Sequence, residues 1–182
     1  MEVRETDLKN VLLFKPFIHE DWRGKYAELF NEKDYSEAIR ERTGHTVNFV
    51  EDNMSTSLQH VLRGIHGDDK TWKLISCLKG SIYVVIVNCD RKSEYFGKWQ
   101  SFDLSDRNKH QILVPPMYGT SHLVMSEGGA FFHYKESEYY DPKNLKQFTY
   151  RFDHHEFDIW WPIKKPLLSK RDEITKEIDY SK

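Results

Sequence analysis

The chain has 182 residues, a length typical of one domain with enough residues to bury a sizeable core. Its 27 basic and 29 acidic residues leave a net charge of -2, so it has no global basic field for nucleic acid or an anionic membrane. Any bound anion would need a local cluster of cations. We therefore expect one domain over residues 1–182, with neither nucleic acid nor membrane as a partner.

The sequence also carries information on compartment. The N-terminal decapeptide MEVRETDLKN has no apolar signal core, and the longest apolar run, residues 82–87, is far too short to span a bilayer. Cys77 and Cys89 lie in apolar runs without a CxxC spacing, which predicts two buried reduced thiols. These features favour a soluble, cytoplasmic protein.

The residue pattern is mainly that of β-structure. Apolar, aromatic and β-branched runs, in places alternating with polar residues, predict short strands. In chain order the strands fall at residues 11–17, 25–30, 47–50, 61–80 (two strands around a turn at 67–69), 81–87, 100–104, 111–114, 122–125, 130–135, 148–152 and 159–161. The run SIYVVIV at 81–87 is uninterrupted, which indicates a buried strand.

Two helices are expected among these strands. Residues 32–42 have a helical pattern closed by Gly44, and residues 169–178 predict a second helix with Ser169 as its N-cap. About ten short strands with frequent turns predict an all-β fold, a cupin-like jelly-roll β-sandwich with short peripheral helices. Because such sandwiches commonly pair their edge strands, a homodimer is the expected assembly.

Residues 61–80, VLRGIHGDDKTWKLISCLKG, concentrate the potential chemistry. Arg63 is an anion binder, His66 a proton carrier and Lys73 a cation. Residues of the same parity in a strand share a face, so Arg63 and Lys73 could face one side, unless the turn at 67–69 resets the parity. On spacing alone, a structural interpretation is as good as a functional one. In it, Arg63 and Lys73 are solvated strand charges and His66 is a hydrogen-bonded core histidine.

RGIH followed by KLISCLKG, in a jelly-roll context, resembles the nucleotide-sugar 3,5-epimerases. The best-known branch of that family acts on dTDP-4-keto-6-deoxyglucose in rhamnose synthesis. Further segments resemble the family's motifs in the same order: residues 21–30 (D-x-R-G-x-F-x-E-x-F), 52–55 (Q-D-N-x-S), 87–99 (D-x-R-x-x-S-x-x-F-G-x-W), 115–122 (P-x-x-x-x-H), 134–142 (Y-K-x-x-x-Y-Y-x-P) and 159–172 (I-x-W-P…L-S-x-K-D). Ordered matches over about 150 residues are a stronger signal than any one motif.

The departures from these motifs bear on the substrate. The rhamnose branch has RGxHxQ, whereas here Gly67 and Asp68 follow His66, and Glu51 takes the Gln position of Q-D-N. RGIHGD resembles a branch that acts on GDP-linked 4-keto-heptoses for capsular polysaccharide. Since Gly67 and Asp68 follow the expected base, we expect them to change which sugar or nucleotide fits. GDP-4-keto-heptose is therefore the predicted substrate, and dTDP-4-dehydrorhamnose the alternative.

Epimerisation beside a ketone needs a base, a group that stabilises the enolate oxygen, and an acid on the opposite face. The resemblance implies His66 as the base, Asp172 as the carboxylate that orients it, Lys73 beside the C4 oxygen and Tyr134 as the acid. Each has a structural alternative: a buried histidine, a capping carboxylate after Ser169, a solvated lysine and a core tyrosine. Whether C3, C5 or both carbons are inverted stays open.

The resemblance also implies residues that bind the substrate. They are Arg63 and Arg23 for pyrophosphate or sugar, Glu28 for the nucleotide base across a dimer, Asn53 from the D-N motif, Tyr139 and Tyr140 along the sugar and nucleotide pocket, and His122 as a second pocket histidine. Guanidinium pairs bidentately with phosphate. The carboxylate of Glu28 matches the edge of guanine, which favours GDP, although an ordinary edge-strand charge is the alternative.

Other classes of jelly roll are weighed against this one. A metal-binding cupin has HxH with a following Glu and a later His, whereas His66 stands alone and Lys73 would repel a cation. We therefore expect neither a metal nor a cofactor. The rivals are a sugar 3,4-ketoisomerase and a non-catalytic sugar-binding protein. Tyr134 together with His66 and Asp172 favours the epimerase, and proton exchange from D2O would exclude a mere binder.

Overall fold

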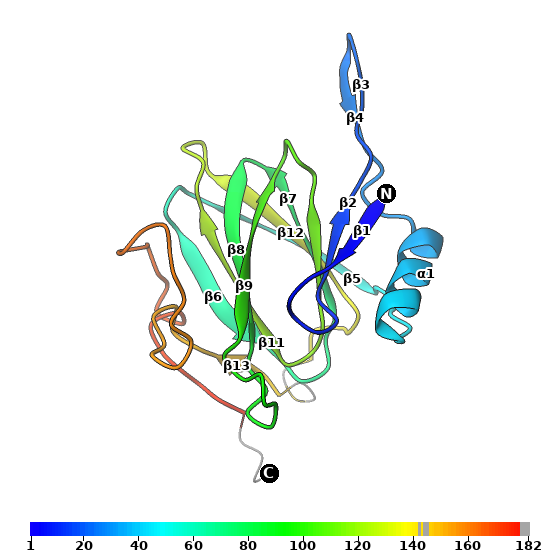
Figure 1. The fold of residues 1–182 in the computed structure, drawn as a ribbon. Coiled ribbons are helices and arrows are strands. Elements are labelled where there is room, and N and C mark those ends of the chain that lie inside the picture. Colours follow the sequence, from blue (N-terminus) through cyan, green and yellow to red (C-terminus); the bar gives the residue numbers. More distant parts are fainter. Residues whose placement is uncertain (142, 144–145, 179–182) are drawn as a thin grey trace.

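The computed structural model describes residues 1–141, 143 and 146–178, and its main body is a sandwich of two antiparallel sheets (Figure 1). Within these residues the strands are β1 (Glu2–Glu5), β2 (Leu12–Lys15), β3 (His19–Asp21), β4 (Gly24–Tyr26), β5 (Glu51–Ser57), β6 (Leu62–Gly67), β7 (Lys73–Lys79), β8 (Ser81–Asn88), β9 (Trp99–Ser105), β10 (Gln111–Val114), β11 (Tyr118–Val124), β12 (Ala130–Glu136) and β13 (Phe148–Thr149). One helix, α1 (Glu32–Thr43), accompanies them. The all-β jelly-roll expectation is confirmed.

The order of strands in the sheets brings distant parts of the chain together. One sheet has the order β1-β2-β10-β7-β12-β5 and the other has the order β13-β6-β11-β8-β9. The strands that carry the candidate residues are therefore neighbours: β6 pairs with β11 in one sheet, and β7 pairs with β12 in the other. Residues far apart in sequence thus face one another across the sandwich.

The position of β8, between β11 and β9, explains why its sequence lacks polar interruptions. Ile82, Val84 and Ile86 point into the core between the sheets, whereas Tyr83 and Val85 pack in a second apolar cluster on the outer face. Because both faces are covered, alternation with polar residues would be unfavourable. Each fully buried aliphatic side chain of this kind stabilises the fold by roughly 1.5–3 kcal/mol.

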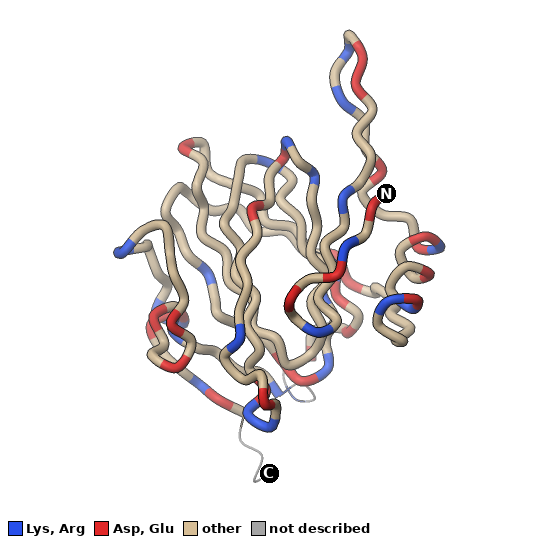
Figure 2. Tube along the Cα trace, in the orientation of Figure 1, with Lys and Arg blue, Asp and Glu red and all other residues tan. Residues whose placement is uncertain are grey.

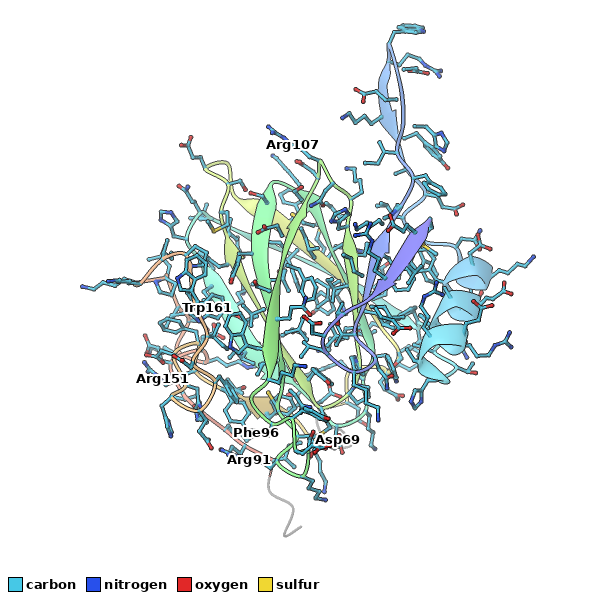
Figure 3. All side chains as sticks on the ribbon, in the orientation of Figure 1. Asp69, Arg91, Phe96, Arg107, Arg151 and Trp161 are labelled. Atoms are coloured by element: carbon cyan, nitrogen blue, oxygen red, sulfur yellow. The ribbon has the colours of Figure 1, made fainter. Side chains whose placement is uncertain are left out.

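The second apolar cluster is covered by the C-terminal segment, residues 150–178. Trp161 stands against the five-stranded sheet (Figure 3), with its indole N–H donating to the carbonyl of Phe152 at 2.8 Å. The strand predicted at 159–161 is absent from the described chain, because these residues pack by side chains without joining a ladder.

The predicted helix at 169–178 is wrong. The amide of Asp172 donates to the carbonyl of Ser169, which closes a single turn. Beyond it, Lys176 exchanges backbone hydrogen bonds with Thr149 at 2.6 and 2.7 Å, so the chain is extended there. Pairing with the β13 edge therefore overrides the local helical pattern of these residues.

The helix predicted in the first half is confirmed as α1. The side chain of Asn31 caps its N-terminus by accepting from the amide of Asp34, and Gly44 ends it in the left-handed conformation, with φ 76°. Tyr35 and Ile39 bury its apolar face on the outside of the six-stranded sheet. The strand predicted at 47–50 is wrong: Val47 packs in this cluster, and β5 begins at Glu51, directly after a backbone hydrogen bond from Val50 to Glu136.

The hairpin β3–β4 projects away from the sandwich (Figure 1), and its side chains point into open space (Figure 3). Phe17, Trp22 and Tyr26 on or beside it are 65 %, 93 % and 67 % exposed. The strand predicted at 25–30 ends at Tyr26, since among the described strands it pairs with β3 alone. A protruding arm with exposed aromatic side chains is typical of a segment that docks on another surface.

Acidic and basic residues are interspersed along the described trace (Figure 2), in agreement with a nearly neutral chain. Within the same residues, no helix is long and apolar enough to cross a membrane.

Candidate active site

A cavity of about 260 Å³ lies between the two sheets, and the four predicted catalytic residues line it together with Arg63 and His122. Its lining residues are Ser55, Arg63, His66, Lys73, Thr120, His122, Phe132, Tyr134, Ser169, Arg171 and Asp172. A larger cavity of about 620 Å³ is lined by other residues, mainly 6–10 and 115–118, and contains none of the predicted site residues. The smaller cavity is therefore the candidate active site.

His66 and Asp172 form a close pair on one side of this cavity. His66 Nε2 lies 2.8 Å from Asp172 Oδ1, and the carboxylate is almost fully buried. Oδ1 also accepts from the amide of Gly64 at 3.0 Å, and Oδ2 accepts from the hydroxyl of Ser169 at 2.6 Å. Burial alone would raise the pKa of Asp172, but the hydrogen bonds from His66, Ser169 and Gly64 lower it to about 2. The carboxylate is ionised and holds the imidazole in one orientation.

The local structure explains why position 64, in the RGIH sequence, is a glycine. A Cβ on Gly64 would lie 2.3 Å from the carbonyl oxygen of Thr120 on the neighbouring strand, and Gly64 has a φ of 107°. Only glycine fits both conditions without strain. The glycine thus allows β6 to approach β11 closely and presents its amide to Asp172.

Tyr134 and Lys73 approach the cavity from the other sheet. Lys73 Nζ lies 6.0 Å from the centre of the Tyr134 ring and 3.2 Å from Glu136 Oε1. Burial, with smaller effects from the charges of Glu136 and Glu51, raises the pKa of the Tyr134 phenol. The phenol is therefore protonated at neutral pH and able to donate a proton.

His122 lies deeper between the sheets. Its ring stacks on Phe132, with the centroids 3.9 Å apart and the planes 8° from parallel. Burial, and then the charges of Arg63 and His66, lowers the pKa of His122 to about 3. A histidine of this kind stays neutral at physiological pH, so it offers a hydrogen bond and no charge.

Two arginines line the cavity. Arg63 is held by Ser57 and by the carbonyl of Thr56, with its Nε donating to Ser57 Oγ at 2.9 Å. Arg171 comes from the C-terminal segment and adds a second guanidinium. Together with Lys73 they make the cavity suitable for an anion and unfavourable for a metal cation.

Several predicted binding residues lie outside the cavity lining. Asn53 is directly opposite Tyr134 on β5, where it donates to Glu51 and Glu136. Four others are exposed and away from the lining: Arg23, Glu28, Tyr139 and Tyr140. Arg23 pairs with Asp21 on the projecting hairpin at 2.6 Å. Within one copy of the chain, the described residues do not bring these four to the cavity.

The reason given for a changed substrate at Gly67 and Asp68 is wrong. Neither residue lines the cavity. A Cβ on Gly67 would lie 2.3 Å from the ring of Phe148, so the glycine makes room for a core side chain. Asp68 is buried and accepts hydrogen bonds from the amides of Lys70 and Thr71, at 3.0 and 2.7 Å. Its carboxylate therefore fixes the turn between β6 and β7.

Some lining residues were not singled out from the sequence. They are Ser55, Thr120, Phe132 and Arg171. Arg171 lies beside Asp172 within the matched segment 159–172, so its neighbour in that motif could have indicated it. Phe132 precedes Tyr134 by two residues in one strand and shares its face, a relation that parity alone would have predicted. Nothing in the sequence separates Ser55 and Thr120 from other polar strand residues.

Comparisons with known proteins show the family of the chain. The profile of the dTDP-4-dehydrorhamnose 3,5-epimerase family matches residues 5–179. A dTDP-4-dehydrorhamnose 3,5-epimerase of Shigella flexneri is 34 % identical over 175 residues, which are 94 % of this chain and 93 % of that protein.

Solved structures resemble the chain over nearly all of its length. The dTDP-6-deoxy-D-glucose-3,5-epimerase of Legionella pneumophila, in complex with dTDP-4-keto-L-rhamnose, has a TM-score of 0.86 at 32 % identity and covers 97 % of this chain and 92 % of its own. A 3'-monoepimerase of Streptomyces bikiniensis, in complex with dTDP-quinovose, has a TM-score of 0.83 at 26 % identity and covers 94 % and 85 %.

These relatives are carbohydrate epimerases, so the chain is an enzyme of the isomerase class. The chain belongs to the dTDP-4-dehydrorhamnose 3,5-epimerase family. The predicted GDP-4-keto-heptose branch finds no support among these relatives, which are named for dTDP-linked sugars.

Proposed function

We propose that this protein inverts C3, C5 or both carbons of a dTDP-linked 4-keto-6-deoxy sugar by removing and returning an α-proton. The observation that carries the proposal is the 2.8 Å contact between His66 and Asp172 in the cavity that Tyr134 and Lys73 also line. A base paired with a buried carboxylate, a cation and a protonated phenol are the groups that epimerisation beside a ketone requires.

Each group has one role in the proposed reaction. His66 takes the α-proton, and the ionised Asp172 stabilises the imidazolium that results. Lys73 holds the negative charge that develops on the C4 oxygen of the enolate. Tyr134 gives its proton to the opposite face of the same carbon, and solvent later returns a proton to Tyr134 and takes the proton from His66. The chemistry involves only proton transfers, so it requires no cofactor.

Binding of the nucleotide diphosphate is assigned to the cations. Arg63 and Arg171 are suited to the pyrophosphate, because guanidinium groups pair bidentately with phosphate oxygens. We assign Tyr139 and Tyr140 to the rim of the cavity, around the sugar and the nucleotide. Both side chains are exposed and follow the C-terminal end of β12. His122 and Asn53 support the inner wall.

We propose that the protein works as a homodimer whose single domain lends its β3–β4 hairpin to a second copy. The hairpin carries Arg23, and Glu28 follows it, at a distance from their own cavity and with exposed aromatic side chains around them. Docking on a partner would bury those side chains and bring both residues to a substrate. Action in the cytoplasm stays a prediction of the sequence.

A dTDP sugar is preferred to GDP-heptose for two reasons. The relatives and the solved complexes carry dTDP-linked sugars in their names, and the residues that suggested GDP-heptose, Gly67 and Asp68, have structural tasks away from the cavity. The similarity to both a 3,5-epimerase and a 3'-monoepimerase leaves the number of inverted carbons to experiment.

The test is incubation with dTDP- and GDP-linked 4-keto sugars in D2O, followed by NMR of each ring carbon. We expect deuterium at C3, C5 or both, with inverted configuration, and a higher rate for the dTDP-linked sugar. His66→Asn keeps the shape of the side chain but has no base, so turnover should fall by at least ~10²-fold with dTDP binding retained. Exchange at the wild-type rate in that variant would refute the role of His66, and an absence of exchange in the wild type would refute the proposed function.

A further inference from the structure

At one end of the six-stranded sheet, three charged residues form one row across neighbouring strands. Glu136 on β12 is directly opposite Lys73 on β7 and directly opposite Glu51 on β5. Glu136 and Lys73 form an ion pair of 3.2 Å, and their side chains are only 13 % and 18 % exposed. The row therefore reads cation, anion, anion across three strands.

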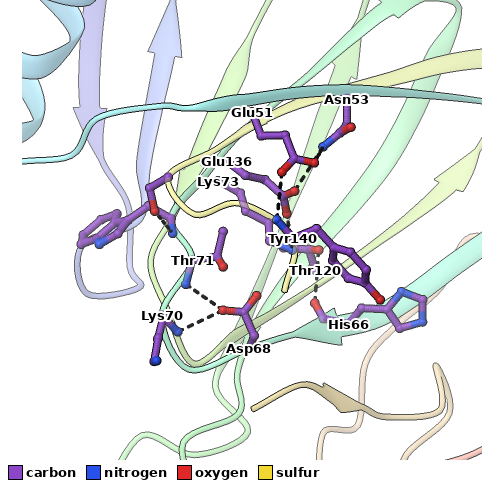
Figure 4. Close-up of polar contacts among 12 residues, drawn as sticks. Glu51, Asn53, His66, Asp68, Lys70, Thr71, Lys73, Thr120, Glu136 and Tyr140 are labelled. Atoms are coloured by element: carbon purple, nitrogen blue, oxygen red, sulfur yellow. Dashed lines mark hydrogen bonds and ion pairs between the residues drawn. The ribbon is translucent and has the colours of Figure 1, made fainter. Parts of the chain in front are cut away.

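Two carboxylates directly opposite one another are unfavourable unless other groups compensate. Figure 4 shows the compensation: the side-chain amide of Asn53 donates to both, at 3.1 Å to Glu51 and 3.2 Å to Glu136. The second oxygen of Glu51 accepts from the backbone amide of Tyr140 at 2.9 Å. Glu136 is thus fixed from both sides, by Lys73 and by Asn53.

This arrangement touches the reacting groups of the proposed site. Tyr134 and Glu136 are two residues apart in one strand, so both side chains are on the same face. The ammonium of Lys73 contacts both, at 6.0 Å from the Tyr134 ring centre and 3.2 Å from Glu136. The motif Y-K-x-x-x-Y-Y does not specify position 136, which is Glu in this chain.

We propose that Glu136 is a positioning residue, which holds the Lys73 ammonium beside Tyr134 and places a carboxylate on the same face of the strand as the phenol. This inference rests on the proposed function, because it assigns Glu136 to the step in which Tyr134 donates. Glu136 itself is not among the residues that line the cavity.

The charges around Tyr134 come from every element packed on it. The facing groups are Lys73 on β7, Glu136 on its own strand, Glu51 on β5, Arg63 and His66 on β6, His122 on β11, and Arg171 and Asp172 from the C-terminal segment. After burial, Glu136 and Glu51 raise the pKa of the phenol, whereas Arg171 and Arg63 lower it. Loss of the Glu136 charge also leaves Lys73 without its counter-ion, and both effects lower the pKa of Tyr134.

The opposite face of the same two strands offers a matched control. Asp52 on β5 pairs with Lys135 on β12 at 2.6 Å and also contacts His133. These side chains alternate with Asn53, Tyr134 and Glu136, so they point away from the cavity. Asp52→Asn therefore breaks an ion pair between the same strands without changing the charge that faces Tyr134.

The experiment compares wild type, Glu136→Gln and Asp52→Asn in two ways. The first is the pH dependence of kcat and KM for inversion of the dTDP-linked 4-keto sugar. The second is an ultraviolet titration of the Tyr134 phenol, taken as the difference between each protein and the same protein carrying Tyr134→Phe. The titration needs no catalytic activity, so it tests Glu136 even if the proposed function fails.

For Glu136→Gln we expect the basic limb of the kcat profile and the midpoint of the phenol titration to move together to lower pH, by at least about 0.5 pH unit. This is the shift expected when one nearby negative charge is removed. We also expect kcat to fall at least ~5-fold with KM changed less than ~2-fold. Asp52→Asn should move neither titration nor limb. Unchanged titration in Glu136→Gln, or an equal shift in Asp52→Asn, would overturn the inference. A wild type that neither exchanges nor inverts the sugar would instead refute the proposed function.

Discussion

At the scale of single residues, the cavity places its proposed base and its proposed acid on different sheets. His66 belongs to β6 and Tyr134 to β12, and they are joined by no hydrogen bond among the described contacts. Each proton transfer is therefore expected to be separable from the other by substitution. In an enzyme that used one residue for both proton transfers, a single substitution would abolish both.

Tyr134→Phe tests that separation. The variant keeps the ring and its packing against Phe132, at 5.3 Å between centroids, so the fold should survive. His66 still removes the α-proton, and return from His66 restores the original configuration. Solvent deuterium should therefore enter sugar of unchanged configuration while net inversion falls by ~10²-fold or more.

The measured quantity is the ratio of exchange to inversion, read by NMR in D2O. Water that reaches the vacated face allows slow residual inversion, so the ratio and not the absolute rate decides. A ratio equal to that of the wild type would assign Tyr134 to packing only.

The buried carboxylate of Asp172 predicts how the stability of the fold depends on pH. Its pKa of about 2 is below the ordinary value of 3.8, so its ionised form stabilises the fold above pH 4, and this contribution is lost as pH falls through 2. The shift corresponds to about 2 kcal/mol. Chemical denaturation from pH 6 to pH 2 should show the wild type losing this amount relative to Asp172→Asn, and a pH-independent difference between them would contradict the assignment.

Not all of this chemistry could be predicted from residue spacing. His66 and Asp172 are far apart in sequence, and neither periodicity nor burial indicates that they meet. The resemblance to a family supplied that pair. Parity along the predicted strand 130–135 would have placed Phe132 on the face of Tyr134, but Glu136 lay beyond the predicted end of that strand. The Lys73–Glu136 contact depends on strand register, which the sequence alone did not determine.

At the scale of elements, the strands buried on both faces were the most predictable. β8 and β10 were found at nearly their observed bounds, because apolar runs of this kind fit few other structures. The segment 169–178 was not predictable in this way: its polar residues follow a helical pattern, but pairing between Lys176 and Thr149 decides its conformation. Local sequence patterns do not indicate tertiary pairing of this kind.

The β6–β7 connection gives a prediction at this scale. Gly67→Ala inserts a methyl group against Phe148 and the carbonyl of Tyr118, at 2.3 and 2.7 Å, so it should destabilise the fold by about 1–3 kcal/mol. Gly128→Ala is the matched control, because a Cβ there meets nothing within 4 Å. Urea denaturation measures both.

The same variants test whether Gly67 influences the choice of substrate. The ratio of kcat/KM for dTDP- and GDP-linked sugars should stay within ~2-fold of wild type in Gly67→Ala, because the residue lies outside the cavity. A changed ratio at retained stability would restore Gly67 as a specificity determinant.

At the scale of the whole molecule, the projecting hairpin predicts complementation between inactive variants. His66→Asn lacks the base, and a variant carrying Arg23→Ala and Glu28→Ala lacks the residues that the hairpin would lend. In a mixed dimer, one cavity has both the base and an intact hairpin. Random mixing makes half of the dimers mixed, with one intact site each, so activity should return to roughly a quarter of wild type.

The control for that experiment is a mixture of His66→Asn with Tyr134→Phe. Both defects lie in the cavity of their own chain, so every cavity in a mixed dimer keeps one defect and no activity should return. Absence of complementation in the first mixture would mean that each copy builds its site alone.

The exposed tryptophan at the tip of the hairpin allows docking to be followed by fluorescence. Trp22 is 93 % exposed, whereas Trp72 and Trp99 are partly buried against apolar clusters. An indole in water emits at longer wavelength than one in an apolar setting. Docking of the hairpin on a second copy would thus move the fluorescence of Trp22 to the blue, and dilution would reverse it. The protein carries its own optical probe of assembly, which Trp22→Phe would silence.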